Sequence, residues 1–330
     1  MADTSSKPPY RRGPLKTVWP SSARPLSHRA ARRADEGYGL SDSPDWRGID
    51  WPAHTHQVEV DGIPVNYVDL GEGIPVVFIH GLGGCWQNWL ENLPRFAEGH
   101  RAIALDLPGF GRTPMPSEPI SITFFARIVD HFCEALNLGR VSLVGNSMGG
   151  FTAAETAIRH PERVDDLVLV DAAGITSATI SESPIGERVA RAVLSRGQGE
   201  GQQVDLSRLL KRPGLIALAM GFVARYPTLI SRDVLAEQLL SVGAPGFQDS
   251  FDAIIAYDFR DRIGEISCPT LIVQGAEDIL VPLGDAHHYA EVIEGGEIIV
   301  FDDTGHVPML ERPIDFNNAV IEFIDRVGVQ

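Results

Sequence analysis

The stretch Val141-Ser142-Leu143-Val144-Gly145-Asn146-Ser147-Met148-Gly149-Gly150 decides how this chain is interpreted. Its apolar start predicts a buried strand, and the residues that follow it predict a helix, with a Gly-x-Ser-x-Gly turn in between. Such a turn exposes the serine on a strained backbone, and its glycines remove side chains that would clash where strand and helix meet. Because a serine becomes a nucleophile only when it is exposed and activated by a neighbour, we predict that role for Ser147.

Short apolar segments alternate with helical patterns on both sides of this turn. An Asp61-Gly62 hairpin joins alternating segments within residues 56–68. Further strands are predicted at residues 76–79, 102–105, 141–144, 166–170, 270–273 and 297–301. Helices are predicted at about residues 86–97, 121–137, 148–160, 284–293 and 313–327. This alternation is typical of an α/β protein with a mostly parallel sheet that is covered on both faces.

The alternation stops after Gly174 and resumes near residue 266. Three helical patterns separated by prolines lie in between, at residues 206–210, 215–225 and 234–240. We therefore expect residues 175–265 to form a helical lid, inserted into a core made of residues 51–174 and 266–330.

Residues 1–50 are rich in Pro, Ser, Arg and Gly and lack hydrophobic periodicity, which predicts a disordered basic arm. Residues 1–33 carry a net charge of +7, so the rest of the chain carries −23 of the total of −16. Such an acidic remainder argues against nucleic-acid binding. A transit peptide or a contact with an acidic partner are alternatives to a plain tail, although the prolines disfavour a transit peptide's helix.

Three cysteines, Cys85, Cys133 and Cys268, make an odd count without a metal-ligand spacing, which favours a reduced, cytoplasmic environment. His287 and His288 are adjacent, so they cannot share a helix face as metal ligands would, and we predict no metal site. No apolar run reaches the roughly 20 residues of a membrane span, and we see no secretory signal at the N-terminus.

Two loops after predicted strands supply partners for Ser147. Asp278 follows the strand at residues 270–273, and His306 follows the strand at residues 297–301. Because the carboxyl ends of parallel strands meet at one edge of a sheet, we expect these three side chains to converge. His306 would take the proton of Ser147, and Asp278 would orient and stabilise the imidazole.

Other carboxylates compete with Asp278 for this role. Asp171 also follows a predicted strand and is the second choice. Asp302 and Asp303 lie too close in sequence to His306 to reach its ring easily. Asp106 lies in a tight loop with Pro and Gly, where we expect it to stabilise the turn.

Acyl chemistry also needs hydrogen-bond donors for a developing oxyanion. We expect one donor to be the backbone N–H of Met148 and the other that of Leu82, in the glycine-rich loop after the strand at residues 76–79. That loop lacks the glycine spacing and the lysine of a phosphate-binding loop. Gly81 and Trp86 are the candidate substrate-binding residues, although core packing would also explain Trp86.

Together these motifs resemble the α/β-hydrolase superfamily over about residues 56–328. The resemblance is carried by His80-Gly81, Asp106-x-Pro108-Gly109-x-Gly111, Gly145-Asn146-Ser147-Met148-Gly149-Gly150, Gly275-x-x-Asp278 and Gly305-His306. It implies an α/β-hydrolase fold with an inserted lid. It also implies a serine nucleophile, rather than the aspartate of the dehalogenase and epoxide hydrolase branches, and no cofactor.

The elbow also looks like that of the meta-cleavage-product hydrolases, which split carbon–carbon bonds in dienoic ring-fission products. This chain has Gly83-Gly84-Cys85 where those enzymes usually carry Gly-Pro-Gly, and Val307 where they tend to carry Trp. The resemblance further implies a lid arginine, for which Arg188 and Arg191 are candidates.

From these features we predict a cofactor-independent serine hydrolase that cleaves a small or medium carboxylic ester through an acyl-enzyme. The apolar residues 215–220 of the expected lid suggest a hydrophobic pocket. The alternatives are a carbon–carbon hydrolase and a non-catalytic receptor that binds a small ligand. We expect a small-molecule ester as the partner, no nucleic acid, no membrane span, and a monomer or homodimer.

Overall fold

The computed structural model describes residues 34, 36–41, 44–177, 212, 220–241 and 243–328. The strands are β1 (Thr55–Val60), β2 (Ile63–Leu70), β3 (Pro75–Ile79), β4 (Arg101–Leu105), β5 (Val141–Asn146), β6 (Val164–Val170), β7 (Thr270–Gly275) and β8 (Glu297–Phe301). They form one eight-stranded sheet in the order β1-β2-β4-β3-β5-β6-β7-β8. Strand β2 pairs antiparallel with β1 and β4, and the other pairs are parallel. The predicted mostly parallel sheet is therefore confirmed.

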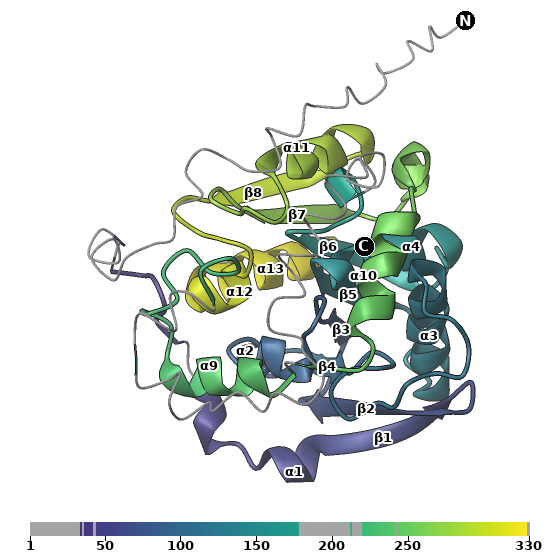
Figure 1. Cartoon of the computed structure of the whole chain (residues 1–330), viewed down its shortest axis with the longest axis horizontal. Helices are drawn as coiled ribbons and strands as arrows, with labels where there is room; N and C mark the ends of the chain where they lie inside the picture. The colour runs from purple at the N-terminus through teal and green to yellow at the C-terminus, as the bar shows by residue number, and fades with distance from the viewer. Residues whose placement is uncertain are drawn as a thin grey trace, which may run out of the picture.

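Helices cover both faces of this sheet (Figure 1). The α-helices are α1 (Trp51–His54), α2 (Leu93–Phe96), α3 (Ile122–Ala135), α4 (Met148–Arg159), α9 (Arg232–Gln238), α10 (Phe247–Ala256), α11 (Leu283–Val292), α12 (Pro308–Glu311) and α13 (Pro313–Val327). The 3-10 helices are η3 (Trp46–Gly48), η4 (Trp86–Trp89), η5 (Leu239–Ser241) and η6 (Arg260–Glu265).

One helix prediction was wrong. The pattern at residues 86–97 forms two short helices, η4 and α2, rather than one continuous helix. Pro94 has no N–H to continue a helix from the preceding turn, so it stands at the start of α2. The bend between η4 and α2 is buried, and the side-chain amide of Asn92 within it donates to the Met309 carbonyl.

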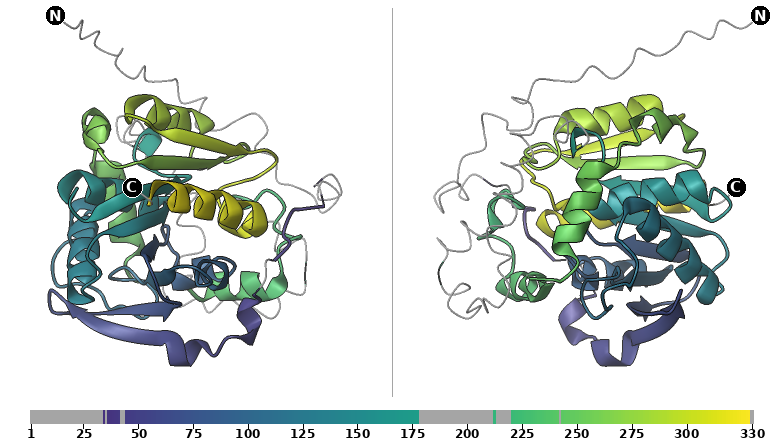
Figure 2. Two further views of the ribbon diagram at one scale, coloured as in Figure 1. Left: turned by 180° about the vertical axis from the view of Figure 1, so that it is seen from behind. Right: turned by 45° about the vertical axis from the view of Figure 1, so that its right-hand side comes forward.

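Successive strand residues point to opposite faces of the sheet and enter two separate cores. Ile79 and Leu143 join the core under α3, α4 and α11, whereas their neighbours Phe78 and Val144 join the core under α2 and α13. In the left view of Figure 2, α13 lies in front of the sheet, with α3 at the side. This double burial explains why the central strands are mostly apolar.

Strand β5 passes directly into α4 at Ser147, whose backbone has φ 56° and ψ −116°. Two glycines make the approach possible. A Cβ on Gly149 would lie well under 3.0 Å from the Ile79 carbonyl oxygen, and one on Gly145 would meet the Gly149 carbonyl as closely. The predicted strand–turn–helix is present, and Ser147 is its strained, partly exposed apex.

Part of the predicted lid, residues 178–211, 213–219 and 242, lies outside the described residues, including the helical pattern at residues 206–210 and the candidate arginines Arg188 and Arg191. Within it, α9 corresponds to the pattern predicted at residues 234–240. Residues 1–33 of the predicted arm also lie outside the description. The described residues 36–41 and 44–50 differ from the predicted disorder, because η3 forms there and Tyr38 and Trp46 are buried in the core under α2 and α13. No helix among the described residues has the length and apolarity needed to cross a membrane.

The close packing at the turn between β5 and α4 predicts that only glycine fits at position 149. We expect Gly149→Ala to lower the free energy of unfolding by about 2 to 4 kcal/mol, because its new methyl group overlaps a main-chain oxygen that cannot rotate away. Chemical denaturation measures this change. Gly284→Ala, in α11 with open space at its Cβ position, is the control and should stabilise by at most about 1 kcal/mol. Equal effects of the two substitutions would contradict the packing argument.

Candidate active site

His306 and Asp278 form a direct hydrogen bond, 2.7 Å between Nδ1 and Oδ2, and both side chains are buried. The other carboxylate oxygen of Asp278 accepts from the backbone N–H groups of Leu280 (2.7 Å) and Val281 (3.1 Å). These amides fix the carboxylate, which in turn fixes the ring. With Nδ1 donating to Asp278, Nε2 is the nitrogen that remains to accept a proton.

Asn146 ties the elbow to the loop that carries His306. Its side-chain amide donates to the His306 carbonyl (3.1 Å) and to the Val170 carbonyl (3.2 Å). The backbone N–H of Ser147 donates to the same Val170 carbonyl at 2.9 Å. The structure thus brings the predicted nucleophile and base onto bonded, neighbouring loops. Sequence reasoning assigned no role to Asn146, whose only signal was its position before the serine.

Asp171, the second candidate for the carboxylate that orients His306, lies beside Asp278 and His306. The side-chain ligand atoms of Asp171, Asp278 and His306 all lie within 4.8 Å of one another, and Asp171 Oδ1 accepts from the Gly275 N–H at 2.9 Å. Burial, followed by the charge of Asp278, raises the pKa of Asp171 well above its ordinary value. The neutral form of Asp171 is therefore favoured beside Asp278, whose carboxylate is hydrogen-bonded to the His306 ring.

The predicted oxyanion loop packs against the elbow. A Cβ on Gly81 would lie 3.2 Å from the Ser147 Cβ, so only glycine allows this approach without displacement. Among the hydrogen bonds of the described residues, none uses the N–H of Leu82 or Met148, which leaves both donors available. Their assignment to the oxyanion, like that of Gly81 to substrate, stays a prediction.

Buried His80 shapes this loop. Its Nδ1 donates to the Gly81 carbonyl at 2.8 Å, and its Nε2 accepts from the Leu107 N–H at 3.0 Å. Burial lowers the pKa of His80 to about 4, which keeps the ring in the neutral form that can both donate and accept. The sequence showed His80 as part of a motif but gave it no role.

Asp106 stabilises its turn as predicted. Its carboxylate accepts from the Asn66 side-chain amide (2.9 Å) and from the backbone N–H groups of Arg112 (2.9 Å) and Trp86 (2.8 Å). The Trp86 ring packs on Trp51, with 4.9 Å between ring centroids, and is buried. This contact is the core packing that the sequence also allowed, and a substrate contact for Trp86 stays a prediction.

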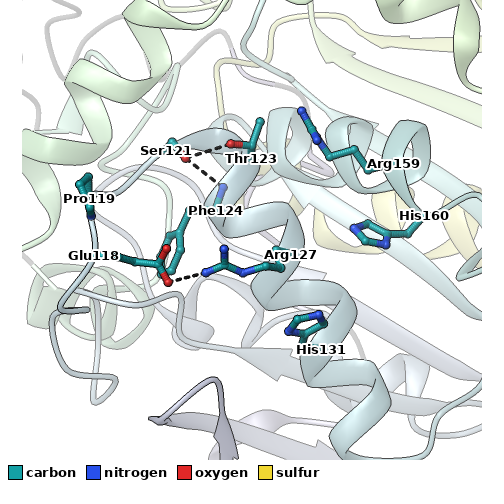
Figure 3. Close-up of a pocket in the computed structure, with 9 residues that line it drawn as sticks. All are labelled: Glu118, Pro119, Ser121, Thr123, Phe124, Arg127, His131, Arg159 and His160. Carbon is teal, nitrogen blue, oxygen red and sulfur yellow. Dashed lines mark hydrogen bonds and ion pairs between the residues drawn. The ribbon is translucent and has the colours of Figure 1, made fainter.

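A separate pocket of about 500 Å³ lies between α3 and the C-terminal end of α4 (Figure 3). It is lined by Glu118, Pro119, Ser121, Thr123, Phe124, Arg127, His131, Arg159 and His160. Helix α4 has 12 residues, so this end lies about 18 Å from Ser147. Each basic side chain of the pocket already has an acidic partner, so the pocket offers a ligand no unpaired charge.

Comparisons with known proteins point to one family. The family model described as the alpha/beta hydrolase fold matches residues 74–313. A 2-hydroxy-6-oxo-6-(2'-aminophenyl)hexa-2,4-dienoic acid hydrolase of Metapseudomonas resinovorans is 30% identical over 273 residues, covering 82% of this chain and 90% of the relative.

Two solved structures are also similar. A meta-cleavage product hydrolase matches with a TM-score of 0.65 and 27% identity, over 83% of this chain and 99% of that chain. An enzyme that degrades N-acyl homoserine lactones matches with a TM-score of 0.65 and 28% identity, over 81% and 99%.

The two carboxyl groups beside His306 should respond differently to amide replacement. We expect Asp278→Asn to lower kcat/KM by about 10³- to 10⁴-fold, because the imidazole loses its charged partner and its tautomer is reversed. Asp171→Asn should lower it by less than about threefold and leave the acid limb of the pH–kcat/KM profile in place, because an amide replaces a carboxyl whose raised pKa favours the neutral form. The profile of each variant measures this. A shift of the acid limb to lower pH in Asp171→Asn would mean that Asp171 is ionised.

Proposed function

Because the chain belongs to the alpha/beta hydrolase fold family and is a hydrolase, we propose that Ser147, His306 and Asp278 form its catalytic triad. The hydrogen bond of 2.7 Å between His306 Nδ1 and Asp278 Oδ2 carries this proposal. Asn146, directly before the strained and partly exposed Ser147, donates its side-chain amide to the His306 carbonyl and so links the two loops, which supports the proposal.

The proposed reaction transfers an acyl group to water. Ser147 Oγ forms a bond to the substrate's carbonyl carbon while its proton passes to His306 Nε2, and the N–H groups of Leu82 and Met148 hold the resulting oxyanion. Collapse of this intermediate breaks the bond to the leaving group, which takes the proton from His306. Water then attacks the acyl-enzyme by the same route, and the carboxylic acid leaves.

We propose a small or medium carboxylic ester as the substrate. The likeness to the enzyme that degrades N-acyl homoserine lactones supports this class, because a lactone is a cyclic ester. In this proposal residues 175–265 form the lid, and its apolar residues 215–220 favour an apolar acyl or alcohol group. We further propose that the protein acts in the cytoplasm as a monomer or homodimer.

Carbon–carbon hydrolysis is the second candidate, and it is supported by the dienoic acid hydrolase of Metapseudomonas resinovorans and by the solved meta-cleavage product hydrolase. The same carbonyl chemistry serves both reactions, since only the leaving group changes from an alkoxide to a stabilised carbanion. We rank the ester as the first candidate, because this chain differs from the usual meta-cleavage-product hydrolase pattern at Gly83-Gly84-Cys85 and at Val307.

Paired assays test the substrate class. We expect purified protein to hydrolyse short-chain p-nitrophenyl esters with a higher kcat/KM than a 2-hydroxy-6-oxo-dienoate, and Ser147→Ala to lower the ester rate by at least about 10³-fold. The reverse preference would establish the second candidate. Equal ester rates in wild type and Ser147→Ala would refute the serine mechanism.

A fluorophosphonate probe distinguishes the enzyme from a non-catalytic receptor with the same fold. The probe reacts only with an activated serine, whose Oγ–P bond forms as the P–F bond breaks. We expect labelling at Ser147, identified by mass spectrometry of the peptide, and none in Ser147→Ala. A wild-type protein that resists the probe would support the receptor.

A further inference from the structure

The side chain of Glu311, in α12, is fully buried and is hydrogen-bonded to the loop that carries His306 (residues 302–307, here the histidine loop) on both sides of His306. It accepts from the backbone N–H of Gly305, at 2.9 Å to Oε1 and 3.0 Å to Oε2, and from that of Val307 at 3.2 Å. The residues directly before and after the proposed base are therefore bonded to one side chain. Charge-assisted bonds of this kind are roughly twice as strong as those between neutral groups.

Two further donors complete the coordination of Glu311, and both come from distant parts of the chain. The Tyr38 hydroxyl donates to Oε2 at 2.5 Å, and the backbone N–H of Arg225 donates to the same oxygen at 2.7 Å. Burial raises the pKa of Glu311, whereas these donors favour its charged form.

Tyr38 is itself held at both ends. Its hydroxyl oxygen accepts from the Tyr226 N–H at 2.8 Å, and the two rings meet edge to face with centroids 5.2 Å apart. The next residue, Gly39, donates its N–H to the Glu311 carbonyl at 2.7 Å. Close by, the His306 N–H donates to the Val223 carbonyl at 2.7 Å. The segment around Tyr38 thus packs against the same support as the histidine loop.

We propose that Tyr38 and Glu311 are positioning residues for His306, so that a segment ahead of the region matched by the family model is part of the catalytic apparatus. Glu311 fixes the backbone of the loop, and Tyr38 fixes the carboxylate that does so. Neither side chain touches substrate in this proposal. The inference rests on the proposed function, because it assigns His306 the role of base.

For this role, Tyr38 and Glu311 must hold the histidine loop rigidly in place. A proton transfer between Ser147 and His306 needs the ring placed to within a fraction of an ångström, and misplacement by about 1 Å costs as much as 10²-fold in rate. Removing the Tyr38 hydroxyl leaves Glu311 with one donor fewer and leaves the Tyr226 N–H without its acceptor. The histidine loop then gains freedom without losing any catalytic group.

The test measures the second-order rate of fluorophosphonate labelling of Ser147 in the full chain, which is independent of the substrate class. We expect Tyr38→Phe to lower this rate by about three- to tenfold, because the loop is less well held, and Glu311→Gln by about 10²-fold. In an ester assay, the loss should fall on kcat and leave KM nearly unchanged, since no substrate contact is removed. If Tyr38 had only a structural role, Tyr38→Phe would lower the melting temperature and leave the labelling rate unchanged.

Tyr257→Phe is the matched control. The Tyr257 hydroxyl also donates to a buried glutamate, Glu155 Oε1, at 2.8 Å, but this pair lies outside the histidine loop. It should lower the melting temperature while leaving the labelling rate at the wild-type value. Equal labelling rates in Tyr38→Phe, Tyr257→Phe and wild type would overturn the inference.

His306→Ala separates the two failures. If His306→Ala abolishes labelling while Tyr38→Phe has no effect, the inference is wrong and the proposed triad stands. If His306→Ala still labels at the wild-type rate, the triad itself is wrong. Because Glu311→Gln removes a buried charge and could unfold the protein, Tyr38→Phe decides the matter alone.

Discussion

The contact of strand β5 with helix α4 is the constraint on which the rest of the structure depends. Main-chain atoms meet there without intervening side chains, because a Cβ on Gly145 would overlap the Gly149 carbonyl, and one on Gly149 would overlap the Ile79 carbonyl of the adjacent strand β3. The positive φ of Ser147 accompanies this contact, and backbone hydrogen bonds from the Ser147 N–H to the Val170 carbonyl and from the Ala173 N–H to the Ser147 carbonyl hold it in place. The two cores on either side of the sheet supply the burial that offsets such local strain.

The sequence predicted the parts of the molecule that repeat a simple physical pattern. Strands buried on both faces are mostly apolar, so the apolar runs within β5, β6 and β7 could be recognised in the sequence. Asp278 and His306 could be found because both follow such strands, and their hydrogen bond agrees with that expectation. The helix expected at residues 86–97 was wrong because one proline outweighed an apolar pattern.

Contacts between distant segments could not be predicted in this way. Asn146 and Glu311 act on main-chain groups, and any residue type can supply an N–H or a carbonyl. Nothing in the sequence around Tyr38 marks it as a partner of a residue 273 positions away. The choice between Asp171 and Asp278 was open for the same reason, since both follow strands that end at the same edge of the sheet, and sequence position does not tell which carboxylate bonds to the His306 ring.

The position of β8 at the edge of the sheet has a consequence for how the molecule fluctuates. Within the described part of the chain, this strand pairs on one side only, with β7, and most of its side chains are half-exposed. Edge elements of this kind open in partial unfolding events at a lower free energy than central strands do. Since the loop after β8 carries His306, such an opening would separate the imidazole from the elbow while β5 stays folded. Amide hydrogen exchange in β8 would then report the fraction of molecules that are briefly inactive, and inactivation would precede global denaturation.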